Sequence, residues 1–213
     1  MTDYRRASPI IFEATAEETE LRDRWEVILA YRGEGNGPAL VDLSHCAKWD
    51  VQDKNLSELE PGRLKIPDSP GTCLVAGDVI VSRLNSRQAS IWQFSETTPV
   101  WSDLPFLTET TDAYALMAVI GRETMGIIEK VSALDLTPPD KKPPFLLLGQ
   151  VLHIPMQLLV MDGERRPSGI LLACSRGYGQ CVVQALLDAG SEFGLKPSGE
   201  KRFVDWMRNL SVV

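Results

Sequence analysis

One stretch near the C-terminal end, residues 169–197, constrains the fold more than any other part of this 213-residue chain. Residues 170–174 form a short apolar run that predicts a buried strand, and the glycines that follow predict a turn. The segment 180–189 then places Val183 and Leu186 at helical spacing. A glycine after this segment can end the helix in a left-handed conformation. The stretch therefore predicts a strand packed against a helix.

Strand patterns lie on both sides of a linking segment at residues 97–112. Apolar residues alternate with polar ones, or form short runs bounded by turn residues, in segments 25–31, 39–51, 71–84, 88–94, 113–121 and 146–161. Residues 85–87, Asn-Ser-Arg, predict the turn of a β-hairpin. The strands thus fall into two groups, one in each half of the chain.

Two further segments predict helices. Thr15 and Glu18 have the spacing of a capping box, which predicts a short helix over residues 15–24. Apolar residues at helical spacing predict another helix over residues 122–134. The repeated order of strands and helix predicts an α+β fold of two intertwined βαββ-type halves around a central cleft. We expect a single domain, residues 1–213, with subdomains at about 1–100 and 110–213.

Composition excludes several classes of function. The net charge of −7 argues against binding to nucleic acid or to an anionic membrane surface, since both require a basic face. No apolar run approaches the roughly 20 residues of a membrane helix, and the N-terminus lacks a signal core, so we expect a cytoplasmic protein. The four cysteines form no C-x-x-C pair and there are only two histidines, so we expect no metal site.

Polar residues gather in one short motif, Asp42-Leu-Ser44-His45-Cys-Ala-Lys48. An aspartate, a serine and a histidine together suggest a hydrolytic triad, but triad members normally converge from distant parts of a chain. The nucleophile elbow of hydrolases is also missing. We expect instead that Asp42 and Ser44 bond the backbone of a turn and that His45 packs against it.

Several segments together resemble the glycine cleavage T-protein (aminomethyltransferase) folate-binding family. They are the DLSHCAK motif, Pro61-Gly62, the strand around Asp78, the strand and helix after Asp112, and the tail SEFGLKPSG at 191–199. The likeness covers roughly residues 38 to 200. In size and departures the chain is most similar to a small relative, the gamma subunit of heterotetrameric sarcosine oxidase. The resemblance implies a T-protein-like folate-binding fold in which the C-terminal barrel is absent.

The resemblance also implies a ligand cleft and tetrahydrofolate as its cofactor. Its candidate residues here are Asp42, Ser44, His45, Leu171, Arg165 and Arg166. Leu171 stands where the family has the carboxylate that pairs the pterin, and a leucine cannot accept hydrogen bonds. Gly77 replaces the first of two acidic residues, which leaves Asp78 as the catalytic residue if the chain is an enzyme. These departures predict weak or no folate binding.

The C-terminal segment has an apolar stripe. Phe203, Trp206, Met207 and Leu210 recur at helical spacing. Two interpretations remain open: the helix folds back on its own core, or the stripe is an interface, since exposed tryptophan and methionine often anchor a partner. Either a protein partner or self-association is expected, because a domain without the family's barrel leaves surface uncovered.

Three functions therefore remain. The first is a noncatalytic subunit of a complex that metabolises one-carbon groups from an N-methyl amine or glycine. The second is a stand-alone folate-dependent aminomethyltransferase that uses Asp78. The third is a T-protein-like module that binds a different small ligand in the old cleft.

Overall fold

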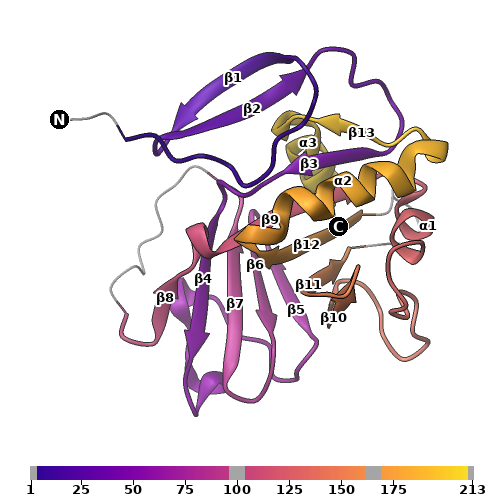
Figure 1. The fold of residues 1–213 in the computed structure, drawn as a ribbon. Helices are drawn as coiled ribbons and strands as arrows, with labels where there is room; N and C mark the ends of the chain where they lie inside the picture. Colours follow the sequence, from indigo (N-terminus) through magenta and orange to yellow (C-terminus); the bar gives the residue numbers. More distant parts are fainter. Residues whose placement is uncertain (1–3, 96–103, 162–168, 211–213) are drawn as a thin grey trace.

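A computed structural model describes residues 4–95, 104–161 and 169–210. Thirteen strands form three sheets, and three α-helices and five short 3-10 helices complete the described part of the chain (Figure 1). Mixed sheet and helix architecture was expected from the sequence. No helix among the described residues is long and apolar enough to cross a membrane.

The largest sheet has six strands. Their spatial order is β10 (Phe145–Val151), β11 (Ile154–Val160), β12 (Gly169–Ser175), β9 (Tyr114–Ile120), β3 (Ala39–Asp42) and β13 (Lys196–Ser198). All neighbours are antiparallel except β13 and β3, which are parallel. Strand β12 is the buried strand predicted at residues 170–174. It pairs with β11 along one edge and with β9 along the other. Strand β3, from the N-terminal part of the sequence, pairs directly with β9.

A second sheet has five antiparallel strands. Their order is β5 (Cys73–Ala76), β6 (Val79–Arg83), β7 (Gln88–Gln93), β4 (Ala47–Gln52) and β8 (Leu107–Glu109). The predicted hairpin turn at 85–87 joins β6 to β7. The segment 71–84 is not one strand, because Gly77, at φ +63°, and Asp78 turn the chain between β5 and β6.

The segment 15–24 forms a strand and a turn, and not the predicted helix. Strand β1 (Ala16–Arg22) pairs with β2 (Trp25–Tyr31) through a turn at Asp23 and Arg24, both with positive φ. Such turns match the twist of a two-stranded hairpin. The capping-box pattern is a local signal for a helix too short to be stable alone. Pairing across the hairpin satisfies the same backbone groups and buries Trp25 and Val27, so it prevails.

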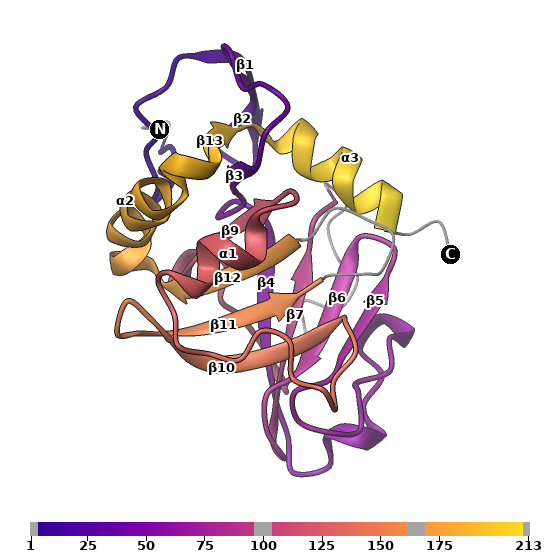
Figure 2. The same cartoon turned by 90° about the vertical axis from the view of Figure 1, so that its right-hand side faces the viewer.

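Helices cover the six-stranded sheet on one face (Figure 2). Helix α1 (Thr124–Glu129), shorter than the segment 122–134, and helix α2 (Gly179–Gly190) pack on the face that carries Ile170 and Leu172. Gly194, at φ +73°, supplies the left-handed conformation expected after α2, at the end of the 3-10 turn Ser191–Phe193.

The opposite face of the six-stranded sheet forms a second core. Leu171 and Ala173 point to this side, as strand alternation requires, and meet Ile80 and Trp92 from the five-stranded sheet. Helix α3 (Glu200–Leu210) closes this core at one end. A third, smaller core lies on the outer side of the five-stranded sheet.

Candidate functional site: the turn after β3 and its charged cluster

The DLSHCAK motif forms the turn between β3 and β4, as predicted. Asp42 accepts hydrogen bonds from the Ser44 backbone N–H (2.9 Å) and from the Ser8 hydroxyl (2.5 Å). The Ser44 hydroxyl lies between the backbone groups of Leu116, accepting from its N–H at 3.2 Å. The Lys48 ammonium, almost fully buried, donates to the carbonyls of Ser44 (2.9 Å) and Cys46 (2.7 Å). Asp42, Ser44 and Lys48 therefore hold the shape of the turn.

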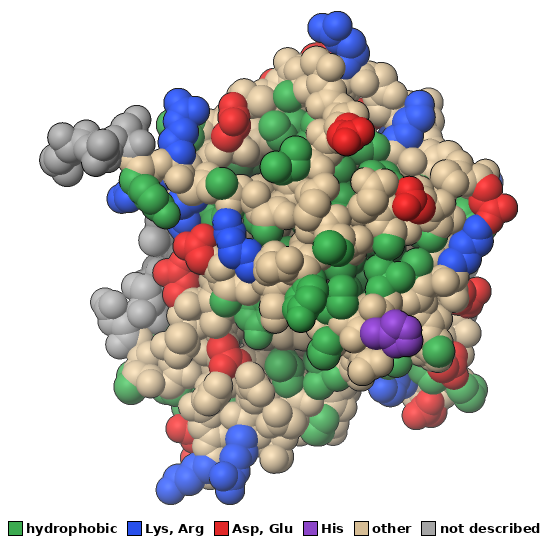
Figure 3. Space-filling model, in the orientation of Figure 1, with side chains coloured by type: hydrophobic (Ala, Val, Ile, Leu, Met, Phe, Trp, Pro, Cys, Tyr) green, Lys and Arg blue, Asp and Glu red, His purple; other side chains and the backbone are tan. Residues whose placement is uncertain are grey.

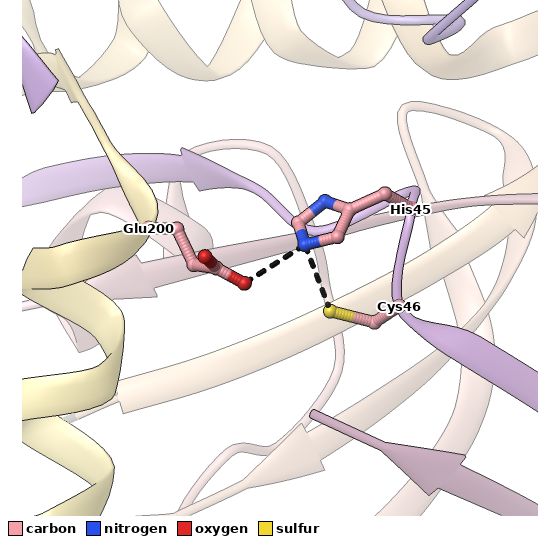
Figure 4. Close-up of side chains that lie close together, drawn as sticks. All are labelled: His45, Cys46 and Glu200. Carbon is pink, nitrogen blue, oxygen red and sulfur yellow. Dashed lines mark hydrogen bonds and ion pairs between the residues drawn. The ribbon is translucent and has the colours of Figure 1, made fainter. Parts of the chain in front are cut away.

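His45 joins a buried cluster that its motif alone does not reveal. Its Nε2 lies 2.8 Å from Glu200 Oε1 and 3.6 Å from Cys46 Sγ (Figure 4). Glu200 is the first residue of α3, and its other oxygen accepts a hydrogen bond from Arg22 at 2.6 Å. Arg22, Glu200 and His45 thus form a continuous ion-pair chain that joins the β1–β2 hairpin, α3 and the turn.

Burial and neighbouring charges shift the pKa values of His45 and Glu200 in opposite directions. Burial lowers the pKa of His45, but Cys46 and Glu200 outweigh it and raise that pKa to about 10, so the ring is a cation at neutral pH. Burial raises the pKa of Glu200, but hydrogen bonds and charges from His45 and Arg22 bring it below its usual value. Burial lowers the pKa of Lys48 to about 8.

The cluster does not have the geometry of a Cys-His-acid relay. In such a relay the nucleophile and the acid bond different ring nitrogens, so that one nitrogen can take the nucleophile's proton. Here Cys46 and Glu200 both approach Nε2. The protonated ring also has no free lone pair, so it cannot act as a base.

His45, Cys46 and Glu200 also offer one nitrogen, one sulfur and one oxygen ligand within 4.8 Å of one another. These atom types suit Zn²⁺, a possibility that cysteine and histidine counting did not raise. A metal would need a neutral imidazole and a thiolate, and it would have to displace the His45–Glu200 ion pair. The neighbouring charges of Arg22 and Lys48 oppose a further cation.

Asp78 lies at a different place, on a cavity of about 940 Å³ between α3, β2 and the ends of β6 and β7. Its lining mixes three basic residues, Arg22, Lys201 and Arg208, with three acidic ones, Asp78, Asp205 and Glu200. The aromatic rings of Phe94 and Phe203 form its floor, with centroids 5.0 Å apart. The structure therefore separates Asp78 from the DLSHCAK turn, with the Arg22–Glu200 pair between them.

Leu171, expected in a ligand cleft, lies in the core instead. Its side chain is fully buried in the same cluster as Phe203, Trp206 and Met207 from α3. The Trp206 ring packs against Gly169, where an added Cβ would be only 2.0 Å from it. The α3 side chains thus pack where the resemblance places a cleft.

The same packing decides between the two interpretations of the C-terminal stripe. Phe203, Trp206 and Met207 are 1%, 7% and 6% exposed, so the stripe folds back on its own core. The chain's own sheets bury these three residues, which agrees with the first of the two interpretations. Leu210 is only partly buried at the edge of this core. Arg165 and Arg166, the remaining cleft candidates, lie outside the described residues.

Sequence reasoning missed Glu200 and Arg22. Glu200 follows the tail SEFGLKPSG directly, but nothing in its spacing links it to His45, which lies 155 positions earlier. Arg22 was assigned to a helix. Only the hairpin and the β13–β3 pairing bring the three residues together.

Comparison with known proteins identifies the fold. No protein-family model matches the chain. Part of the chain is similar to sarcosine oxidase subunit alpha of Rhizobium meliloti (strain 1021), with 33% identity over 107 residues. The match covers 47% of this chain and only 10% of that protein.

Two solved structures are similar over most of the chain. A chain of the heterotetrameric sarcosine oxidase from Corynebacterium sp. U-96, solved with pyrrole 2-carboxylate, matches 73% of this chain and 85% of its own length, with a TM-score of 0.62 and 15% identity. Aminomethyltransferase T of the glycine cleavage system from Bartonella henselae matches 93% of this chain and 60% of its own length, with a TM-score of 0.64 and 15% identity. The chain therefore has a T-protein-like fold, which it shares with a sarcosine oxidase chain and a glycine cleavage T-protein.

Proposed function

We propose that this chain is a noncatalytic, T-protein-like small subunit of a cytoplasmic assembly that metabolises one-carbon groups from an N-methyl amine or glycine. The support is the fold shared with a chain of a heterotetrameric sarcosine oxidase and the partial identity to another organism's sarcosine oxidase alpha subunit. In this proposal the larger subunits carry the redox and folate chemistry. The proposal keeps two intertwined halves, residues 1–100 and 110–213, and the pairing of β3 with β9 supports it.

The observation that carries the proposal is the packing at Leu171. The resemblance implies that a carboxylate at this position pairs the donors of the pterin. A leucine leaves those donors unpaired, at a cost of about 1–3 kcal/mol each. Leu171 is also fully buried beside Trp206 and Phe203, so a pterin at this position would have to displace core side chains.

Calorimetric titration with tetrahydrofolate tests this part of the proposal. We expect no saturable binding in the micromolar range, while a glycine cleavage aminomethyltransferase serves as the positive control. A dissociation constant in the low micromolar range or tighter would overturn the noncatalytic assignment and favour the aminomethyltransferase, with Asp78 as its acid or base.

A protein partner is the second part of the proposal. Leu148 in β10 and Tyr178 directly before α2 are each about half exposed, at 51% and 50%. Apolar side chains also gather on the face over and beside α2 (Figure 3). This surface, rather than the buried α3 stripe, is available to a partner. The net charge of −7 favours a partner with a basic patch, which would speed encounter.

The cavity at Asp78 favours one alternative: a module that binds a different small ligand. Its volume of about 940 Å³, with aromatic and charged residues in its lining, is within the range of small-molecule sites. An Asp78→Asn substitution distinguishes the functions. A noncatalytic subunit keeps full activity of its complex with this variant, whereas an Asp78-dependent enzyme loses at least about a hundredfold.

A further inference from the structure

A second cavity lies beneath the N-terminal segment, on the other side of the Arg22–Glu200–His45 chain. Its volume is about 380 Å³, and residues 5–14 form one wall. This segment is firmly held: the Gln180 side chain bonds both the N–H (2.7 Å) and the carbonyl (3.0 Å) of Ile11. Arg6 binds Asp23 and Asp112, each at 2.5 Å. The cavity is therefore part of the folded chain.

Two buried polar groups on this cavity have no hydrogen-bond partner among the described residues. Trp25 and Ser198 are 2% and 1% exposed and both line it. The Trp25 indole nitrogen and the Ser198 hydroxyl oxygen make no hydrogen bond within the described part of the chain. A buried polar group without a partner costs about 1–3 kcal/mol, so such groups usually meet something else. An indole N–H can only donate, and a hydroxyl donates readily.

His45 adds a third donor. It lines the same cavity, and its second ring nitrogen points away from Glu200 and Cys46 (Figure 4). Because the ring is protonated, this nitrogen carries a hydrogen. Two carboxylates also line the cavity: that of Asp42, which already accepts from Ser8 and Ser44, and that of Glu26, which is exposed. Among the described residues, the buried groups on this cavity that lack a partner are therefore donors and not carboxylates.

The surrounding charges limit the ligand to at most one negative charge. The cations Arg22, His45 and Lys48 face three carboxylates, those of Asp42, Glu200 and Glu20, so this network carries no excess charge. Arg6 adds no excess either, because two exposed aspartates pair with it. A dianion would bring two uncompensated charges into a poorly solvated site, which costs more than one.

The walls indicate the rest of the ligand. Apart from the donors and the charged and polar residues Arg5, Arg6, Ser8, Glu26 and Asp42, the lining is largely apolar and includes Ile10, Phe12, Val27 and Tyr31. Such walls suit an organic body and not the hydration shell of an inorganic anion. We propose that this cavity binds a small organic monocarboxylate, whose carboxylate accepts from Trp25, Ser198 and His45. This inference is independent of the proposed function, since the site lies apart from Leu171 and Asp78.

Calorimetric titration of the full chain tests the site with three probes of known charge. They are benzoate, its neutral isostere benzamide, and sulfate. We expect saturable binding of benzoate, and binding of benzamide and sulfate at least about tenfold weaker. Absence of saturable benzoate binding, or equal affinity for benzamide or sulfate, would overturn the proposal and leave ordinary water as the partner of the buried donors.

Two variants connect binding to this cavity. Ser198→Ala removes a hydroxyl that makes no protein hydrogen bond, so the fold should be unaffected, and Trp25→Phe removes only the indole donor from a similar ring. Each should weaken benzoate binding about tenfold. Ser82→Ala and Trp92→Phe are the matched controls, since both residues are buried away from this cavity, and they should bind benzoate unchanged. Unchanged binding by Ser198→Ala in a folded protein would contradict the assignment.

Discussion

At the scale of single residues, Glu200 links the parts of this molecule that sequence distance separates. It is 4% exposed in its side chain and bonds His45 and Arg22 at once. Removing one partner of a buried charge network leaves the other charges without compensation, which is the costly case for buried ion pairs.

Glu200→Gln should therefore lower the free energy of unfolding by about 3 kcal/mol or more. Denaturant unfolding followed by circular dichroism measures the change. Asp205→Asn, in the same helix but 73% exposed, is the matched control and should cost less than about 0.5 kcal/mol. Equal effects of the two substitutions would show that the cluster contributes nothing.

The pH dependence of stability tests the same residues. The pKa of His45 is raised from 6.5 to about 10, so the folded chain holds a proton that the unfolded chain releases above about pH 6.5. This stabilisation is complete below pH 6.5 and decreases as pH rises. The pKa of Lys48 is lowered to about 8, so its contribution raises the free energy of unfolding with pH, but only above about pH 8.

The free energy of unfolding should thus fall between about pH 6.5 and 8, and His45→Gln should remove most of this slope. Urea unfolding at a series of pH values measures it. His153→Gln is the control, since His153 lies in the exposed β10–β11 turn. A slope that persists in His45→Gln would show that another group causes it.

At the scale of elements, the apolar face of α3 packs in the core, which is one of the two interpretations that the sequence allows. The helix packs so closely on β12 that only a glycine fits at position 169. Trp206 and Phe203 fill the space beside Leu171, so α3 and β12 share one packed core.

Gly169→Ala should lower the melting temperature, because its Cβ would lie 2.0 Å from the Trp206 ring. A loss of about 1–3 kcal/mol is typical of such overpacking. Gly177→Ala is the matched control: no atom lies within 4 Å of the added Cβ, and it should be neutral or slightly stabilising. If Gly169→Ala is equally neutral, Trp206 does not pack as described.

Trp206→Ala should cost about 3–5 kcal/mol of stability, as for a large buried side chain. Association of the surviving folded protein with any partner should be unchanged, because Trp206 is only 7% exposed. Thermal melting and co-purification of this one variant measure both. Weaker association with normal stability would instead restore Trp206 as an interface residue.

Local sequence patterns predicted where strands occur better than they predicted which strands and side chains lie next to one another. The alternation in 25–31 and the apolar run at 170–174 fixed two strands, because burial on one or both faces leaves a direct trace in the sequence. The helix expected over 15–24 failed because pairing with β2 lies beyond a local signal. The site could be predicted only within the turn at Asp42 and Ser44. The His45–Glu200 pair and both cavities depend on contacts across 155 or more positions or between sheets.

At the scale of the whole molecule, the fold agrees with the family resemblance, but the residues expected at its ligand site do not. The strands, turns and tail that build a T-protein-like fold are kept, and two solved structures share that fold at 15% identity. Leu171, where the resemblance implies a carboxylate, lies in the core, and a face beside α2 exposes apolar side chains. A retained scaffold without its ligand contacts is what a noncatalytic subunit requires.

The most direct test of this account is the state of the chain in its own cell. A tagged copy expressed at native level should elute in a complex, at fixed stoichiometry, with a protein similar to sarcosine oxidase subunit alpha. The complex should oxidise an N-methyl amine and lose that activity when this chain is removed. Elution of the chain as a free monomer, with the oxidase activity elsewhere and intact, would contradict the account.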